Sequence, residues 1–148
     1  MMKKIFLGLA IVLVVLQLVR PARNLSASTG PQDITVQCTV PAGVQSILTK
    51  ACYDCHSDNT RYPWYANVQP AGWWLAWHIH EGKRHLNFSE FGAYDFNHAQ
   101  RKLKQISKEI NSHGMPLDSY TWIHRDAILT AVEIKLVNDW AAHSRCDG

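Results

Sequence analysis

The feature that most constrains this chain is the five-residue sequence Cys52-Tyr53-Asp54-Cys55-His56. Residues three or four positions apart share one face of a helix, so Cys52, Cys55 and His56 would project together from a single helical turn. Two thiols can then bond the two vinyl groups of one porphyrin, while the imidazole reaches its iron. This C-x-x-C-H spacing therefore predicts a site for one covalently attached haem c.

Three other interpretations of this motif are possible. A zinc site needs a second pair of ligands at short spacing, whereas Cys38 and Cys146 are isolated in the sequence. A thioredoxin-like redox pair needs a βαβ context, which a helical pattern does not provide. A structural disulfide within the motif would leave His56 without a purpose. Haem attachment is thus the favoured interpretation.

The rest of the sequence predicts an all-α domain. Apolar residues recur at helical spacing over residues 44–55, and a second helix is expected from Pro70 to about Arg84. A third helix should begin near Asp95, and a fourth at a capping box that joins Thr130 to Glu133. The apolar residues expected on these last two helices are Phe96, Ala99, Leu103, Ile106 and Ile110, then Val132, Leu136, Val137 and Trp140. No stretch shows the sustained alternation of a strand.

The first residues resemble an export element. Lys3 and Lys4 precede an apolar run over residues 5–19, and Arg20 follows it. Fifteen helical residues span about 22 Å, which is short of the roughly 30 Å hydrocarbon core but suits a signal peptide or an anchor with snorkelling ends. No small-residue cleavage site follows, so we expect residues 1–21 to form an uncleaved transmembrane signal anchor. Cleavage would instead leave a soluble periplasmic protein.

The composition supports a globular domain behind this element. Residues 22–39 are small and polar and are expected to form a tether, with the haem-binding domain over residues 40–148. Four of the 15 Lys and Arg residues lie in the first 24 positions, which contain no acidic residue. The rest of the chain therefore has 11 Lys and Arg against 12 Asp and Glu, a net charge of −1. A domain so close to neutrality offers no broad basic surface, which argues against nucleic acid as a partner.

The sixth iron ligand is expected to be Met115. Beyond Met1 and Met2 it is the only methionine, and it lies in a loop between Gly114 and Pro116 rather than in a helical stripe. A His/Met ligand pair raises the reduction potential and suits electron transfer. The alternatives are an open sixth position or one of the other histidines, namely His78, His80, His85, His98, His113, His124 and His143.

Two further residues are candidates for contact with the haem. Arg61 could meet the propionates, and Trp73 could form part of the pocket wall, although both also fit a surface or packing role. The Nδ1–H of His56 should donate to a backbone carbonyl, which we place in the Tyr62-Pro63 loop.

Longer stretches around these motifs resemble a known family. The residues 60–91 that follow the motif, together with residues 114–130, are similar to the small membrane-anchored haem-binding domains, which are single-haem, cytochrome c-like proteins of bacteria. The resemblance implies a helical domain wrapped around one haem held by Cys52, Cys55 and His56, and it supports Met115 as axial ligand. Cys38 and Cys146 lie outside the shared core and can either pair or remain free.

These observations together predict an electron carrier rather than an enzyme, because no pair of carboxylates in an apolar setting is evident. The expected protein is a monohaem cytochrome c in the bacterial inner membrane, with its haem domain in the periplasm, where haem attachment takes place. Its expected partners are the membrane, through the N-terminal helix, and an unidentified redox protein. The alternatives are a haem-based sensor or a peroxidase-like protein with an open or His-ligated sixth position.

Overall fold

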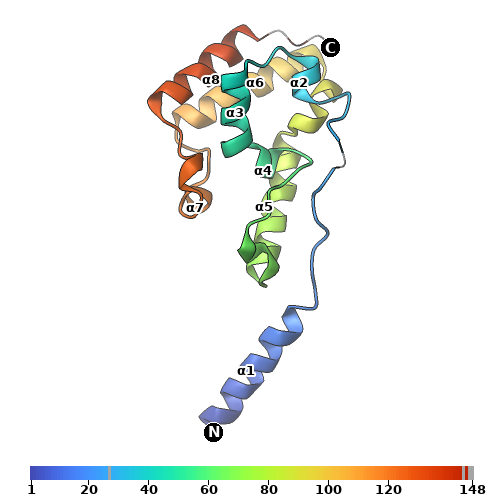
Figure 1. The fold of residues 1–148 in the computed structure, drawn as a ribbon, viewed down its shortest axis with the longest axis vertical. Helices are drawn as coiled ribbons and strands as arrows, with labels where there is room; N and C mark the ends of the chain where they lie inside the picture. Colours follow the sequence, from blue (N-terminus) through green and yellow to red (C-terminus); the bar gives the residue numbers. More distant parts are fainter. Residues whose placement is uncertain (27, 145, 147–148) are drawn as a thin grey trace.

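The computed structural model describes residues 1–26, 28–144 and 146, and over these residues the chain is helical with no β-strand (Figure 1). The predicted all-α class is confirmed. The longer helices are α1 (Met2–Leu16), α3 (Ala42–Ala51), α5 (Ala71–His85), α6 (Phe96–Asn111) and α8 (Ala131–His143). The short helices are α2 (Ile34–Gln37), α4 (Tyr53–His56), η1 (Trp64–Asn67), η2 (Phe88–Ala93), α7 (Asp118–Thr121) and η3 (Arg125–Ala127).

The core lies where α3, α6 and α8 pack together with the segment around α2 (Figure 1). Helix α6 begins after the predicted cap, since the Asp95 side chain accepts a hydrogen bond from the backbone of His98. The predicted apolar stripe of α6 is buried except for Phe96, which lies at the start of the helix and is exposed. The remaining buried side chains of this core include Leu48, Phe88, Phe91, Val137 and Trp140.

The last helix differs from its prediction in which face it buries. The capping box of Thr130 and Glu133 is present and α8 begins directly after it. Val137 and Trp140 are buried as expected, but Val132 and Leu136 are exposed. The prediction that these two are buried is wrong. The buried face of α8, which packs against α3 and α6, consists of Val137, Trp140 and Ala141, and Val132 and Leu136 lie outside it.

The predicted membrane anchor is contradicted by the structure. Helix α1 contains 15 residues and ends at Leu16, so it spans about 22 Å where a bilayer core needs roughly 30 Å. Among the residues that the structure describes, no helix is both long enough and apolar enough to cross a membrane. The predicted location, a single-pass protein of the inner membrane with a periplasmic haem domain, is therefore corrected.

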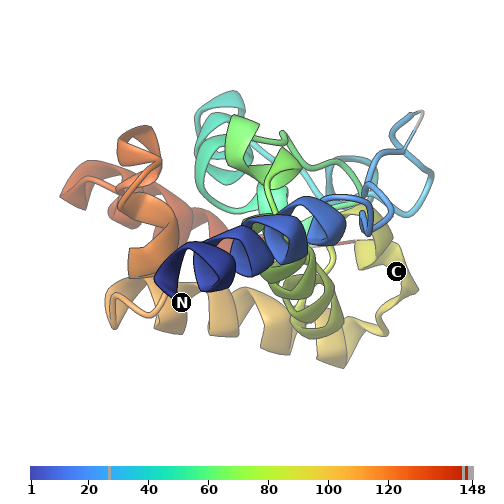
Figure 2. The same cartoon turned by 90° about the horizontal axis from the view of Figure 1, so that it is seen from below.

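The segment expected to be a tether contacts the helical domain. Figure 1 shows α1 on its own at one end of the molecule, with the chain then running up beside the other helices, and Figure 2 shows α1 in front when the molecule is seen from that end. Gln17 exchanges hydrogen bonds with the backbone of Gln69, and the indole N–H of Trp73 donates to the Val19 carbonyl. Further along, Ile34 is fully buried in the core. Packing thus begins well before residue 40.

A disulfide joins the two ends of the packed region. Cys38 and Cys146, whose pairing the sequence leaves open, are bonded to each other across 108 residues. Both are buried, and the Trp140 indole donates to the Thr39 carbonyl beside them. The bond therefore ties the end of α2 to the segment that follows α8.

Candidate haem site

The Cys-x-x-Cys-His sequence forms its own helical turn. Helix α3 ends at Ala51, and Cys52 departs from helical geometry with φ −125° and ψ −43°. The amides of Cys55 and His56 then both donate to the Cys52 carbonyl and begin α4. The sequence predicts one continuous helical face over residues 44–55. The break at Cys52 instead separates the motif from α3 as a short helix of its own, although Cys52 and Tyr53 still pack against the core.

This turn borders a cavity of about 660 Å³. Cys52, Cys55 and His56 line the cavity from α4, and Met115 lines it from the loop between α6 and α7. These four predicted site residues are thus brought together although Met115 is distant in sequence. Most of the other lining residues come from α5 and α6. The apolar residues of the whole lining, apart from the four above, are Ala51, Trp77, Leu86, Phe88, Ile106, Ile110, Pro116 and Leu117.

Gly82 lets α5 approach the motif closely. It lies on the cavity wall, and a Cβ atom at this position would meet the Cys55 carbonyl oxygen at 2.5 Å. Any side chain would therefore force α5 and α4 apart. The absence of one keeps the motif and the α5 wall of the cavity in direct contact.

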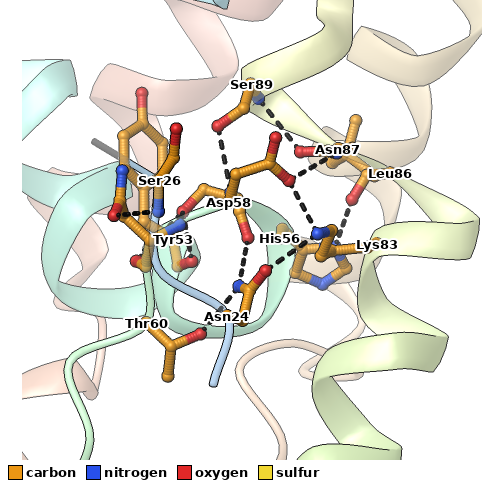
Figure 3. A network of polar contacts seen from close by, with 12 residues as sticks. Asn24, Ser26, Tyr53, His56, Asp58, Thr60, Lys83, Leu86, Asn87 and Ser89 are labelled. Carbon is orange, nitrogen blue, oxygen red and sulfur yellow. Dashed lines mark hydrogen bonds and ion pairs between the residues drawn. The ribbon is translucent and has the colours of Figure 1, made fainter. Parts of the chain in front are cut away.

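The imidazole of His56 is held in the form that binds a metal. Its Nδ1 lies 3.0 Å from the Leu86 carbonyl, as the dashed line in Figure 3 shows. Because a carbonyl only accepts, Nδ1 carries the proton and the lone pair is on Nε2. Burial lowers the pKa of His56, which keeps the ring neutral. The sequence anticipated such an acceptor, but in the Tyr62-Pro63 loop rather than at Leu86.

The Leu86 acceptor is itself supported by polar contacts (Figure 3). The side chain of the next residue, Asn87, donates to Asp58, and Lys83 forms an ion pair with the same carboxylate at 2.7 Å. Lys83 also donates to the Asn24 side chain at 2.8 Å. Burial would raise the pKa of Asp58, but the hydrogen bonds and charge from Lys83 and Asn87 outweigh it and lower that pKa. This network fixes the chain on both sides of the His56 acceptor.

Cys52 and Cys55 are free thiols. Burial raises the pKa of Cys52 to about 12 and that of Cys55 to about 11, so both stay protonated at neutral pH. A thioredoxin-like pair needs a thiol whose pKa is lowered, so this environment does not favour that interpretation. The thiols remain available for bonding to another group in the cavity.

The zinc interpretation gains no support from the geometry. Within the described part of the chain, no three or more His, Cys, Asp and Glu side chains are grouped so as to hold a metal ion. The other cysteines, Cys38 and Cys146, are bonded to each other in the core.

The Met115 loop follows directly from the end of α6. The amides of Gly114 and Met115 both donate to the Glu109 carbonyl, at 2.9 and 3.2 Å. The left-handed residue of this turn is His113, with φ 57°, rather than Gly114. Histidine tolerates that conformation better than most residues. The turn places the Met115 side chain on the wall of the cavity, where it is half-buried.

Arg61 and Trp73 are not among the lining residues of this cavity. The Arg61 guanidinium binds the Asp54 carboxylate, with Nε at 3.2 Å from Oδ1. The Trp73 indole donates to Val19, as described above. Arg61 thus contacts the site through Asp54, which lines the cavity, and the contact of Arg61 or Trp73 with haem stays a prediction.

Of the seven alternative histidines, His78 and His85 line the cavity. His80, His113 and His143 are exposed, and His98 and His124 are half-buried on other surfaces. His78 is hydrogen-bonded through Nδ1 to the Trp74 carbonyl, and its ring is tilted against Trp74 and edge-on to Trp77. The structure therefore narrows the alternative histidine ligands to two.

Sequence reasoning did not identify three residues that shape the cavity. They are Gly82, Leu86 through its backbone carbonyl, and Tyr120, which reaches the cavity from α7. The only sequence signal for any of them was an aromatic residue shortly after the Met115 loop.

The four residues that meet in this cavity are a donor set that fits haem, and the comparison with family models agrees with that. The chain matches the model of the haem-binding domain family over residues 11–143. It therefore belongs to the haem-binding domain family, as the resemblance indicated, and haem binding is its shared property. The match includes part of α1 and the whole segment before Pro41. No curated protein and no solved structure matches the chain.

Proposed function

We propose that the protein is a c-type monohaem electron carrier. The observation that carries the proposal is that two protonated thiols, a neutral imidazole and a thioether line one cavity of about 660 Å³. A cavity of this size falls in the range that proteins use for small molecules and cofactors. When bound there, haem supplies an iron that changes between its ferrous and ferric states by one electron.

The thiols of Cys52 and Cys55 are proposed to attach the cofactor. Each S–H would add across one vinyl group of a bound haem, with a carbon–sulfur bond formed and the hydrogen carried to the other vinyl carbon. Such an addition would consume no oxidant. Gly82 holds α5 against the motif, so both thiols face the same space.

His56 and Met115 are proposed to be the axial ligands. Nε2 of His56 is the free nitrogen of a ring whose other nitrogen is bound to Leu86. The Met115 thioether is a soft, neutral donor that favours ferrous iron and raises the reduction potential. If His56 and Met115 both bound the iron, no position would be left for a substrate, and a bound haem would serve electron transfer.

The remaining cavity residues give the cofactor its environment. Phe88, Ile106 and Ile110 are buried apolar side chains that exclude water from one side of the cavity. Lys102 and Lys108 of α6 also line it and are the cations we propose for the propionates. The electron-transfer partner is proposed to be another redox protein.

The absorption spectrum of the purified holoprotein tests this ligand set. The oxidised protein should be low-spin with the weak near-infrared sulfur-to-iron charge-transfer band, and the ferrous form should bind carbon monoxide poorly. Met115→Ala should abolish the band and lower the potential, whereas Met2→Ala should leave both unchanged. A high-spin wild type that binds carbon monoxide readily would overturn electron transfer in favour of a sensor or peroxidase-like protein.

A low-spin spectrum without the band would point to histidine instead. In that case His78→Ala and His85→Ala should be compared, because these two histidines line the cavity. Loss of the low-spin spectrum in either variant would replace the Met115 assignment.

A further inference from the structure

The loop that carries Met115 is anchored at its two ends in different ways. On the α6 side, the amides of Gly114 and Met115 bind the Glu109 carbonyl. On the other side the chain passes through Leu117 into α7, whose first turn is closed by Tyr120 donating its amide to the Leu117 carbonyl at 2.9 Å. A single residue, Pro116, separates Met115 from the Leu117 carbonyl that Tyr120 binds, so the positions of Met115 and α7 are closely linked.

The Tyr120 hydroxyl bridges from α7 to the haem-attachment motif. It donates to Oδ2 of Asp54 at 2.6 Å, and Tyr120 itself lines the cavity. Asp54 lies between the two cysteines of the motif and is only 6% exposed. This one hydrogen bond joins the turn that bears Cys52, Cys55 and His56 to the segment that bears Met115.

The acceptor of this hydrogen bond is held in place by Arg61. The Arg61 side chain contacts both carboxylate oxygens, at 3.2 Å to Oδ1 and 3.3 Å to Oδ2, and its amide donates to Oδ1 at 3.0 Å. The hydrogen bond to Asp54 raises the pKa of Arg61. Burial, and then Asp54, raise the pKa of Tyr120, so its hydroxyl remains a donor at neutral pH. A fixed carboxylate and a protonated phenol form a charge-assisted hydrogen bond, which is stronger than a neutral one.

We propose that Tyr120 is a positioning residue for the axial ligand Met115, acting through its hydrogen bond to the Arg61-supported carboxylate of Asp54. The inference rests on the proposed His56/Met115 ligation. The bond sets the separation between the motif and the Met115 loop, and so would hold the thioether in the cavity that His56 also lines, where both could bind the iron of a haem. Arg61 contributes by holding the Asp54 carboxylate.

Removing the Tyr120 hydroxyl should release the Met115 loop while the aromatic ring still lines the cavity. Tyr120→Phe keeps the ring that stacks on His124 at 4.3 Å but loses the donor to Asp54. We expect the ratio of Met-bound to Met-free iron to fall about tenfold, since a charge-assisted hydrogen bond is lost. The near-infrared band should weaken or vanish on modest warming, the potential should fall, and carbon monoxide affinity should rise about tenfold.

Tyr53→Phe is the matched control. The Tyr53 hydroxyl donates to Gln45 at 3.3 Å, and Tyr53 does not line the cavity. Its loss should leave the band, the potential and carbon monoxide binding unchanged, even if the temperature of unfolding falls. A Tyr120→Phe holoprotein whose band and potential equal those of wild type and Tyr53→Phe would overturn the inference.

A second variant tests the same hydrogen bond by weakening the support of its acceptor, Asp54. The Arg61 side chain is 56% exposed, so Arg61→Gln should fold. Arg61→Gln should weaken the near-infrared band as Tyr120→Phe does, but to a smaller extent. If Tyr120→Phe cannot be purified, an unchanged band in Arg61→Gln would overturn the inference.

The two proposals fail in different ways. A wild-type protein without the band would overturn ligation by Met115, whereas a band that survives both substitutions would overturn only the role of Tyr120.

Discussion

Gly82 makes the most direct contact between α5 and the haem-attachment motif, and its substitution gives the first prediction. Gly82→Ala would place a methyl group 2.5 Å from the Cys55 carbonyl, so α4 and α5 must separate. We expect a loss of about 1–3 kcal/mol in the free energy of unfolding and a lower haem content. Thermal unfolding and the haem-to-protein ratio measure these.

The control for this prediction is Gly43→Ala. Gly43 lies in α3, and a Cβ there would meet nothing within 4 Å. Alanine should stabilise the helix by up to about 1 kcal/mol. If both substitutions behave alike, Gly82 has no role in keeping α5 against the motif.

At the scale of single residues, the sequence predicted which atoms could bind the cofactor but not what supports them. The Cys-x-x-Cys-His spacing and an isolated methionine are visible as residue types. The acceptor for His56 is a backbone carbonyl, and every residue has one, so no side-chain pattern marks Leu86. The contact of Tyr120 with Asp54 spans 66 residues, a separation that local spacing does not reveal.

At the scale of elements, the segment before α2 behaves as part of the domain. The Asn24 side chain donates to the Ser57 carbonyl and to Thr60 and accepts from Lys83, close to His56 (Figure 3). Asn24→Ala should lower the free energy of unfolding by about 1–3 kcal/mol, because several part-buried groups lose their partner. Denaturant unfolding measures this.

Asn97→Ala is the comparison for Asn24. Asn97 lies in the first turn of α6 and is exposed. Its substitution should change stability by no more than about 0.5 kcal/mol. If Asn24→Ala and Asn97→Ala changed the free energy of unfolding equally, residues 22–39 would be a tether, as the sequence predicted.

The capping box of α8 gives a prediction about pH. The Lys50 side chain, and then the Thr130 backbone, lower the pKa of Glu133 below its ordinary value of 4.5. A lowered pKa in the folded state stabilises the protein above the ordinary pKa, and this contribution is lost as pH falls through the folded value. Glu133→Gln keeps a capping side chain but removes the charge, so it should cost at most about 1 kcal/mol at pH 7.

Measuring this loss of stability at several pH values shows whether it comes from the Glu133 charge. The difference in the free energy of unfolding between wild type and Glu133→Gln should shrink below pH 4.5. Asp139→Asn is the control, because the pair of Asp139 with Lys135 is mostly exposed and should contribute little. A gap that stays constant from pH 7 to pH 3 would contradict the role of the Glu133 charge.

Helix periodicity predicted the positions of α5, α6 and α8 well, because each carries an apolar stripe or a capping signal. It did not predict the break between α3 and α4, since Cys52 and Cys55 continue the apolar spacing of α3. It also misjudged the buried face of α8, because Val132 and Leu136 fit an apolar stripe but are exposed in the structure. Periodicity locates helices, whereas their partners decide which face is buried.

At the scale of the whole molecule, the disulfide closes a loop that contains the entire cavity. The double substitution Cys38→Ser with Cys146→Ser should lower the free energy of unfolding by about 2–5 kcal/mol, chiefly by releasing the unfolded chain. It should leave the haem attached, because neither cysteine lines the cavity. Unfolding curves and haem staining after denaturing electrophoresis measure the two effects separately, and loss of the stain would place these cysteines in attachment.

Mass spectrometry of the tryptic peptide over residues 51–61 tests covalent attachment most directly. Lys50 and Arg61 bound this peptide, and it contains Cys52, Cys55 and His56. In protein purified from a host that attaches c-type haem, the peptide should carry the mass of one intact haem, and neither sulfur should react with iodoacetamide after denaturation. A peptide without haem, with both cysteines alkylated, would contradict the assignment of Cys52 and Cys55 as attachment sites.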